Sequence, residues 1–184
     1  MDPGRGQAPS RPMRIIAGTH RGHRIAAPKG TATRPTSDRV RENAFNLIGP
    51  VDGADVLDLF AGSGAMGLEA LSRGAESVVF VESDRDACRT INANLDKLRL
   101  HATVLCQDVV RALGSERRTY DLVLCDPPYD HDRARLDPQL ARLVAADGLL
   151  VYESSSRDEP PAPAGLRQTT SRTYGSARLT LFRR

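Results

Sequence analysis

The chain has 184 residues, a mass of 20.0 kDa and 40% apolar residues, which is enough for a single domain around one sizeable core. No apolar run approaches the about 18 residues of a membrane span, and the amino terminus carries no hydrophobic signal segment. The composition therefore favours a cytoplasmic protein and argues against a membrane partner.

Cysteine and histidine usage argues against disulfides and metal sites. Cys88, Cys106 and Cys125 are odd in number and lack Cys-x-x-Cys spacing, so we expect three reduced thiols, as in a cytosolic protein. The four histidines are scattered along the chain, so metal ligation has no cluster to use. We expect no metal cofactor.

The net charge of +3 is unevenly distributed. The first 41 residues contain nine Lys or Arg against two acids, a balance of +7, whereas the remainder contains 17 against 21, a balance of −4. Basic charge gathered at one end predicts contact with an anionic polymer such as RNA. A basic arm that only improves solubility is the alternative interpretation.

The chain divides into a tail and one domain. Residues 1–12 are expected to form a flexible tail, and residues 13–184 a single domain. Within that domain a basic hairpin and helix over 13–50 precede a Rossmann-like core over 51–184.

The amino-terminal segment of the domain predicts a hairpin followed by a helix. Strand-like runs at 13–17 and 23–27 flank a Gly-Thr-His-Arg-Gly turn with a basic tip. A hydroxyl residue at 36 or 37 can then cap a helix over 38–48. Arg39 and Arg41 are expected to leave the buried side of that helix.

A glycine-rich turn follows the first buried strand, at 55–60. Gly62, Gly64 and Gly67 allow a sharp bend and a close approach of backbone to ligand, and a helix over 65–73 begins there. The outward N–H groups of such a helix start favour anions, so the pattern is typical of a nucleotide-type site.

The glycine pattern alone does not identify the cofactor. Glu82 ends the next apolar run, 77–83, and lies 20 residues beyond Gly62, where an acid binds the ribose hydroxyls of NAD or of another adenosine cofactor. A helix over 84–98 and a strand over 102–106 follow, and Asp108, taken alone, equally suits a helix N-cap.

A stiff turn, Asp126-Pro127-Pro128-Tyr129, follows a second apolar strand. Its two prolines fix φ and remove two backbone donors, so the turn offers a carboxylate, a carbonyl acceptor and an aromatic face. An exocyclic amine on a flat ring suits this set, because its N–H groups reach the acceptors and its ring stacks on Tyr129. Acceptors that pull those hydrogens out of the ring plane direct the nitrogen lone pair at an electrophile, and catalysis becomes alignment and electrostatics. The alternative is a plain loop in which Asp126 caps a helix.

The carboxyl-terminal third completes an α/β fold. A helix at about 137–146 and a strand at 148–153 precede an antiparallel hairpin of 166–174 and 177–183. Strands alternating with helices predict right-handed crossovers and a Rossmann-like, seven-stranded, mostly parallel sheet that the hairpin closes. A dinucleotide dehydrogenase would continue in βα units and usually add a substrate domain.

Taken together, these motifs resemble a known family. The stretch Asp58-Leu-Phe-Ala-Gly-Ser-Gly64, with Glu82, Asp108 and the Asp-Pro-Pro-Tyr turn, resembles class I S-adenosylmethionine-dependent methyltransferases. The blocks at 18–24 and 34–47 resemble one branch, the RsmD-type enzymes that methylate a guanine amino group in bacterial 16S ribosomal RNA. The resemblance runs from about residue 13 to residue 184.

This resemblance implies a cofactor, a substrate and a set of site residues. The cofactor is S-adenosylmethionine, and the acceptor is the N2 amine of a guanine, position 966 in the usual rRNA numbering, on the small ribosomal subunit. The implied cofactor-binding residues are Asp58, Phe60, Ala61, Gly62, Gly64, Glu82, Ser83 and Asp108. The implied catalytic residues are Asp126, Pro127 and Tyr129, and the implied RNA contacts are Arg21, Arg24, Arg34, Thr36 and Arg39.

Within that set each acid has an implied role: Asp58 at the cofactor ammonium, Glu82 at the ribose and Asp108 at the adenine. Three other functions stay open at this point. The same chemistry could serve adenine or cytosine in DNA, or a protein glutamine; the glycine turn could bind NAD in an oxidoreductase; or the chain could bind RNA without catalysis. Nothing in the sequence suggests more than a monomer.

Overall fold

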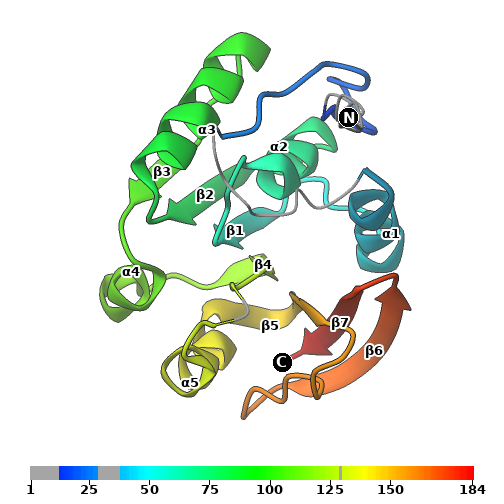
Figure 1. Ribbon diagram of the computed structural model, residues 1–184, viewed down its shortest axis with the longest axis vertical. Helices are drawn as coiled ribbons and strands as arrows, with labels where there is room; N and C mark the ends of the chain where they lie inside the picture. The colour runs from blue at the N-terminus through cyan, green and yellow to red at the C-terminus, as the bar shows by residue number, and fades with distance from the viewer. Residues whose placement is uncertain (1–12, 29–37, 129) are drawn as a thin grey trace, which may run out of the picture.

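A computed structural model describes residues 13–28, 38–128 and 130–184, which form one seven-stranded sheet covered by helices (Figure 1). The strand order is β3-β2-β1-β4-β5-β7-β6. The strands are β1 (Asp55–Leu59), β2 (Ser77–Glu82), β3 (Thr103–Cys106), β4 (Tyr120–Cys125), β5 (Val144–Ser155), β6 (Arg167–Tyr174) and β7 (Ala177–Arg183). Strands β1 to β5 pair in parallel, and β7 pairs antiparallel with β5 and β6. The predicted seven-stranded, mostly parallel sheet with a terminal antiparallel hairpin is confirmed.

Helices cover both faces of this sheet. The helices α1 (Asp38–Ile48), α2 (Ala65–Ser72) and α3 (Arg85–Leu98) pack on one face, and α4 (Val109–Ser115) and α5 (Arg133–Leu143) on the other (Figure 1). Successive strand residues alternate between the two cores: Val56 lies with α2 and α3, whereas Leu57 lies with α4 and α5. Both faces of the parallel strands are therefore buried, which explains their nearly continuous apolar sequences.

Two carboxyl-terminal elements begin earlier than predicted. The α5 helix starts at Arg133 because the Asp132 carboxylate caps it, accepting from the Ala134 N–H at 3.1 Å, one turn upstream of Pro138. Strand β5 starts at Val144, where it pairs with Tyr120 across a register shift. Local propensity missed the start of α5 because Pro138, inside the helix, resembles a helix start.

The amino-terminal hairpin forms without two regular strands. Its arms meet in a single antiparallel bridge between Arg14 and Arg24, supported by N–H to O bonds of 2.9 Å from Ile15 to His23 and from Ile25 to Met13. The next two backbone donors of the first arm, the Ile16 and Ala17 N–H groups, turn instead to the core, where they bind the Glu69 carboxylate of α2. The prediction of two short strands was therefore too regular.

The expectation of three reduced cysteines is wrong for one pair. Cys88 of α3 and Cys106 of β3 form a disulfide, while Cys125 is free and buried in β4. The 18-residue separation carries no sequence signal, but α3 returns antiparallel to the sheet and places the two sulfurs together. No group of three or more metal-ligating side chains occurs among the described residues. None of the helices in the described ranges is long and apolar enough to span a membrane.

Candidate active site

Two turns lie side by side at the carboxyl edge of the sheet. Strands β1 and β4 are parallel neighbours, and their last paired residues are Leu59 and Cys125. The glycine-rich turn leaves the sheet after the first of these residues, and the proline turn leaves it after the second. The Phe60 and His131 rings bridge the two turns edge to face, with centroids 4.7 Å apart and planes at 72°. A ligand on one turn therefore faces a ligand on the other.

The glycine-rich turn has left-handed backbone at three positions. Phe60, Gly62 and Gly64 have φ values of 59°, 55° and 76°. The Ala61 N–H donates to the Val81 carbonyl oxygen at 3.1 Å and so connects the turn to β2. Apart from its chain neighbours, the nearest described atom to the place where a Cβ would lie on Gly62 is the Phe60 carbonyl oxygen, at 4.0 Å. The backbone there is open to a ligand, as predicted for a cofactor-binding turn.

Asp58 lies beneath this turn in a low-dielectric environment. It is 4% exposed, and its Oδ2 accepts from the Gly67 N–H in α2 at 2.9 Å. The pKa of Asp58 is raised to about 8, chiefly by burial; the Gly67 hydrogen bond lowers it, and the negative charges of Asp126 and Glu82 add to the rise. The carboxyl group thus holds the start of α2, while its contact with a cofactor ammonium stays a prediction.

Glu82 connects the glycine-rich turn to the start of α3. Its Oε2 accepts from the Gly62 N–H and its Oε1 from the Asp84 N–H, both at 2.8 Å. Ser83 is exposed beside it. Further along the sheet edge, the exposed Asp108 caps α4 by accepting from the Arg111 N–H at 2.9 Å. The helix-cap interpretation of Asp108 is confirmed, and its contact with an adenine stays a prediction.

The proline turn presents a carboxylate toward the same space. Asp126 is exposed, Pro127 is half-buried, and the His131 N–H donates to the Pro128 carbonyl at 3.0 Å. The negative charge of Asp126 contributes to the raised pKa of Asp58, so the two carboxyl groups interact across the space between the turns. Tyr129 lies outside the described residues.

The donor set suits a cationic adenosine ligand. Glu82 and Asp126 lie beside an open backbone turn, where carboxylates favour a nearby sulfonium or ammonium charge and can accept hydrogen bonds from ribose hydroxyls. Asp58 beneath the turn keeps its proton up to a pH of about 8, and a bound cation would favour its carboxylate form. The residues present therefore fit S-adenosylmethionine.

The candidate RNA contacts are distributed over two elements. Arg21 and Arg24 are exposed on the hairpin and Arg39 is exposed on α1, whereas Arg34 and Thr36 lie outside the described residues. The expectation that Arg41 leaves the buried side of α1 is wrong, because its side chain is fully buried. An acidic residue of α2 compensates the charge of Arg41, and the sequence of α1 alone gives no indication of it.

That acid, Glu69, is one of two site-supporting residues that sequence analysis missed. Its carboxylate accepts from the Ile16 and Ala17 N–H groups at 2.8 and 2.9 Å, and pairs with Arg73 and Arg41. A lone acid in the otherwise apolar helix sequence Ala-Met-Gly-Leu-Glu-Ala-Leu-Ser was the available signal.

The second missed residue, Asn94, has no local sequence signal. It is 1% exposed on α3 and exchanges two hydrogen bonds with Ala26, accepting from its N–H at 2.8 Å and donating to its carbonyl at 3.0 Å. Its amide also donates to the Ser63 carbonyl at 3.2 Å. Asn94 therefore joins the hairpin directly to the glycine-rich turn.

Comparison with known proteins agrees with this geometry. The chain is 40% identical to the Bacillus subtilis protein YlbH over 182 residues, covering 94% of this chain and 99% of that protein. It is 35% identical to Escherichia coli ribosomal RNA small subunit methyltransferase D over 180 residues, covering 94% and 90%. The solved structure of Escherichia coli yhhF superposes with a TM-score of 0.84 at 34% identity, covering 94% of this chain and 97% of that one. The family model described as conserved hypothetical protein 95 matches residues 13–183, and the chain belongs to that family.

Proposed function

We propose that this protein methylates the exocyclic N2 amine of a guanine in 16S ribosomal RNA, with S-adenosylmethionine as methyl donor. The observation that carries the proposal is the juxtaposition of the two turns through Phe60 and His131. The relative named ribosomal RNA small subunit methyltransferase D supports the choice of RNA. We propose further that the protein acts as a cytoplasmic monomer on the small ribosomal subunit.

When bound, S-adenosylmethionine supplies an electrophilic methyl group on a sulfonium centre. The backbone of residues 60–64 would hold its methionine end and Glu82 its ribose hydroxyls. Asp58 would lie beneath its ammonium and Asp108 beside its adenine. The acids around the turn disfavour the anionic pyrophosphate of a dinucleotide and favour this cation.

The proline turn would hold the acceptor. The Asp126 carboxylate and the Pro127 carbonyl accept hydrogen bonds from the guanine amine, which turns the nitrogen lone pair away from the conjugated ring. Tyr129 supplies a stacking surface for the base. No covalent enzyme intermediate is needed, because alignment and electrostatics lower the barrier.

Exposed arginines of the amino-terminal hairpin and of α1 would bind the RNA phosphates around the target guanine. Arg21, Arg24 and Arg39 are exposed and carry no acidic partner among the residues described. A paired guanine inside a duplex cannot reach the site, so the target lies in a loop or is flipped out of its stack.

Methylation of small subunits from a deletion strain tests this function. We expect wild type to restore N2-methylguanosine and Asp126→Ala to lose at least about 100-fold in rate, as when a catalytic hydrogen-bond acceptor is removed. Asp96→Ala, which alters an exposed acid on α3, is the matched control and should retain the wild-type rate. Near-normal transfer by Asp126→Ala would disprove the catalytic assignment. Unchanged N2-methylguanosine in the deletion strain would favour a DNA base or a protein glutamine as acceptor.

A further inference from the structure

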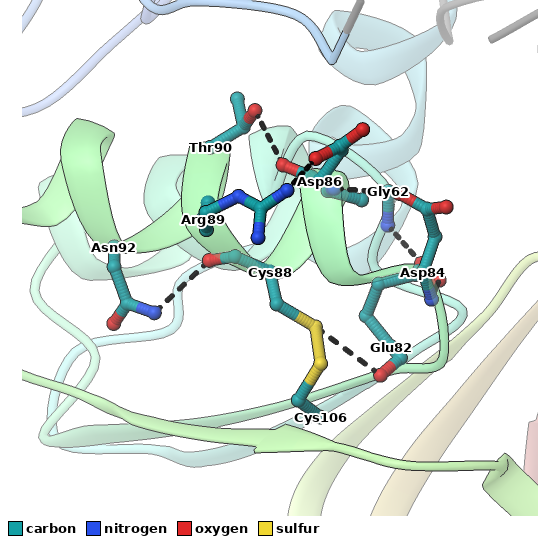
Figure 2. The surroundings of a disulfide bond; sticks show 10 residues. Gly62, Glu82, Asp84, Asp86, Cys88, Arg89, Thr90, Asn92 and Cys106 are labelled. Atoms are coloured by element: carbon teal, nitrogen blue, oxygen red, sulfur yellow. Dashed lines mark hydrogen bonds and ion pairs between the residues drawn. A yellow bond between two sulfur atoms is a disulfide. The ribbon is translucent and has the colours of Figure 1, made fainter.

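The disulfide lies at the adenosine end of the proposed cofactor site. Cys106 is the last residue of β3 and pairs with Glu82 in the parallel ladder, while Cys88 lies in the first turn of α3, which starts after Asp84. Figure 2 shows the two sulfurs beside the backbone carbonyl of Glu82, while the Glu82 side chain extends away from them toward Gly62. The Cα atoms of Cys88 and Cys106 are 6.0 Å apart, a normal separation for a disulfide.

The bond joins a weakly held strand to a firmly packed helix. Strand β3 is at the edge of the sheet, pairs only with β2 and has no buried residue. Cys106 is exposed, whereas Cys88 is 5% exposed and lies on the buried side of α3. A small thiol or disulfide in solution therefore reaches the Cys106 sulfur first.

The reduced state also has its contacts in place. The Cys88 sulfur lies 3.4 Å from the Glu82 carbonyl oxygen. In the disulfide this sulfur has no proton, so the approach is a contact and not a hydrogen bond. After reduction the Cys88 thiol can donate to that same oxygen, which gives both redox states a satisfied arrangement.

Both residues assigned to the adenosine are attached to this link. The Glu82 carboxylate binds the Gly62 and Asp84 N–H groups, and Asp108 follows Cys106 by two residues. Closing the disulfide fixes the end of β3 against α3 and so fixes Glu82 relative to Asp108. Opening it leaves the end of β3 held by its ladder with β2.

We propose that Cys88 and Cys106 form a reversible thiol–disulfide site that sets the affinity for the adenosine cofactor. The inference rests on the proposed function, because it takes Glu82 and Asp108 as cofactor ligands. A low-molecular-weight disulfide is the oxidant. The Cys106 thiolate attacks it, releases one small thiol and forms a mixed disulfide; the Cys88 thiolate then attacks the Cys106 sulfur and releases the second small thiol. The protein loses two electrons and two protons, and the small disulfide becomes two thiols.

The closed state binds the cofactor more tightly, because its two adenosine ligands are already fixed. Reduction should weaken S-adenosylhomocysteine binding by at least about fivefold, the lower end of typical coupling between sites. Cys125 does not take part: burial raises the pKa of its thiol, so it stays protonated and unreactive.

Calorimetric titration of the full chain with S-adenosylhomocysteine tests the proposal. The protein is oxidised with glutathione disulfide, or reduced with dithiothreitol and desalted without oxygen, and alkylation with mass spectrometry confirms the state of each cysteine. We expect a weaker Kd for the reduced protein. Cys106→Ser and the reduced form of Cys88→Ser should bind like the reduced protein. Glutathione disulfide should tighten binding in neither variant, because Cys88→Ser stops at the mixed disulfide on Cys106 and cannot close the link. Thr103→Ala, which alters an exposed residue of the same strand and keeps the disulfide, should respond like wild type.

Equal Kd values for the two verified states would overturn the redox inference and leave the proposed function intact. Absence of binding in both states would overturn the proposed cofactor, and the inference with it. Tighter S-adenosylhomocysteine binding by Cys88→Ser after oxidation would also contradict the inference, because the second sulfur would then be unnecessary.

Discussion

Arg41 and Glu69 form an ion pair in which both side chains are fully buried, with Arg41 Nε 3.6 Å from Glu69 Oε2. The same carboxylate accepts from the Ile16 and Ala17 N–H groups, so one acid fixes both α1 and the hairpin to α2. The helix that carries this acid begins at the glycine-rich turn. The position of the amino-terminal hairpin and α1 relative to the glycine-rich turn therefore depends on the buried Glu69 carboxylate.

Glu69→Gln should destabilise the protein by about 3 kcal/mol, because among the described residues it leaves the buried Arg41 with the part-exposed Asp38 as its one acidic partner. The free energy of unfolding in urea measures the loss. Glu76→Gln, an exposed change of the same chemistry, should cost less than about 0.5 kcal/mol. Equal losses in the two variants would show that the buried pair contributes nothing specific.

Asn94→Ala should release the hairpin from the glycine-rich turn, because it removes the bonds to Ala26 and Ser63. We expect hydrogen exchange at the Ala26 amide to accelerate by about tenfold or more, since removal of a hydrogen bond worth about 1.4 kcal/mol is a factor of ten. Asn92→Ala is the control: it removes an exposed amide on the same helix, whose bond goes to the Cys88 carbonyl within α3. Unchanged exchange in Asn94→Ala would contradict the proposed link.

The sheet and the turns that follow β1 and β4 were predictable from the sequence because their signals are local. Apolar runs, left-handed glycines and paired prolines each constrain nearby backbone, and parallel pairing then brings the ends of β1 and β4 together. The contacts of Glu69 with Arg41 and the hairpin, and those of Asn94 with Ala26 and Ser63, were not predictable, because these partners are far away along the chain. The disulfide was missed for the same reason. The odd number of cysteines and the lack of Cys-x-x-Cys spacing are properties of the sequence alone, whereas the pairing of Cys88 with Cys106 depends on how α3 packs against β3.

Asp58 should make the stability of the protein fall as pH rises. Folding raises its pKa from 3.8 to about 8 because burial disfavours the carboxylate. Between these pH values the folded chain keeps a proton that the unfolded chain has lost, so this contribution to stability is complete below about pH 4 and is lost as pH rises toward 8. Asp58→Asn abolishes the titration, while its amide oxygen can still accept from the Gly67 N–H.

Urea unfolding at a series of pH values measures the effect. From about pH 5 to about pH 8 the wild-type free energy of unfolding should fall more steeply than that of Asp58→Asn, by up to about 1.4 kcal/mol per pH unit. Parallel pH curves for the two proteins would mean that the Asp58 carboxyl group titrates normally.

Removing Arg21 and Arg24 together should weaken RNA binding in a salt-dependent way. The slope of log K against log salt should become shallower by about 0.7 to 0.9 for each phosphate that the double variant no longer neutralises. Binding of a 16S rRNA fragment over a range of salt concentrations measures that slope. Arg135→Ala is the control, because Arg135 is exposed on α5, at the end of the molecule away from the hairpin (Figure 1). An unchanged slope in the double variant would place the RNA on another surface.

His131 should align the two turns through its ring, because its ring packs against Phe60 and its N–H holds the Pro128 carbonyl. His131→Ala removes the ring and keeps the backbone bond, so the proline turn should lose its alignment. An aromatic pair is worth about 0.5 to 1.5 kcal/mol, so we expect methyl transfer to small subunits to slow by up to about tenfold. Affinity for S-adenosylhomocysteine should change less, since the contacts of the glycine-rich turn with Val81 and Glu82 remain.

His131→Phe tests whether the ring or its nitrogen matters. The Nε2 atom is buried without a hydrogen-bond partner among the described residues, so a ring without nitrogen should restore most of the rate. A slow Phe variant would assign the effect to Nε2, and wild-type rates in both variants would show that the turns stay aligned without this contact.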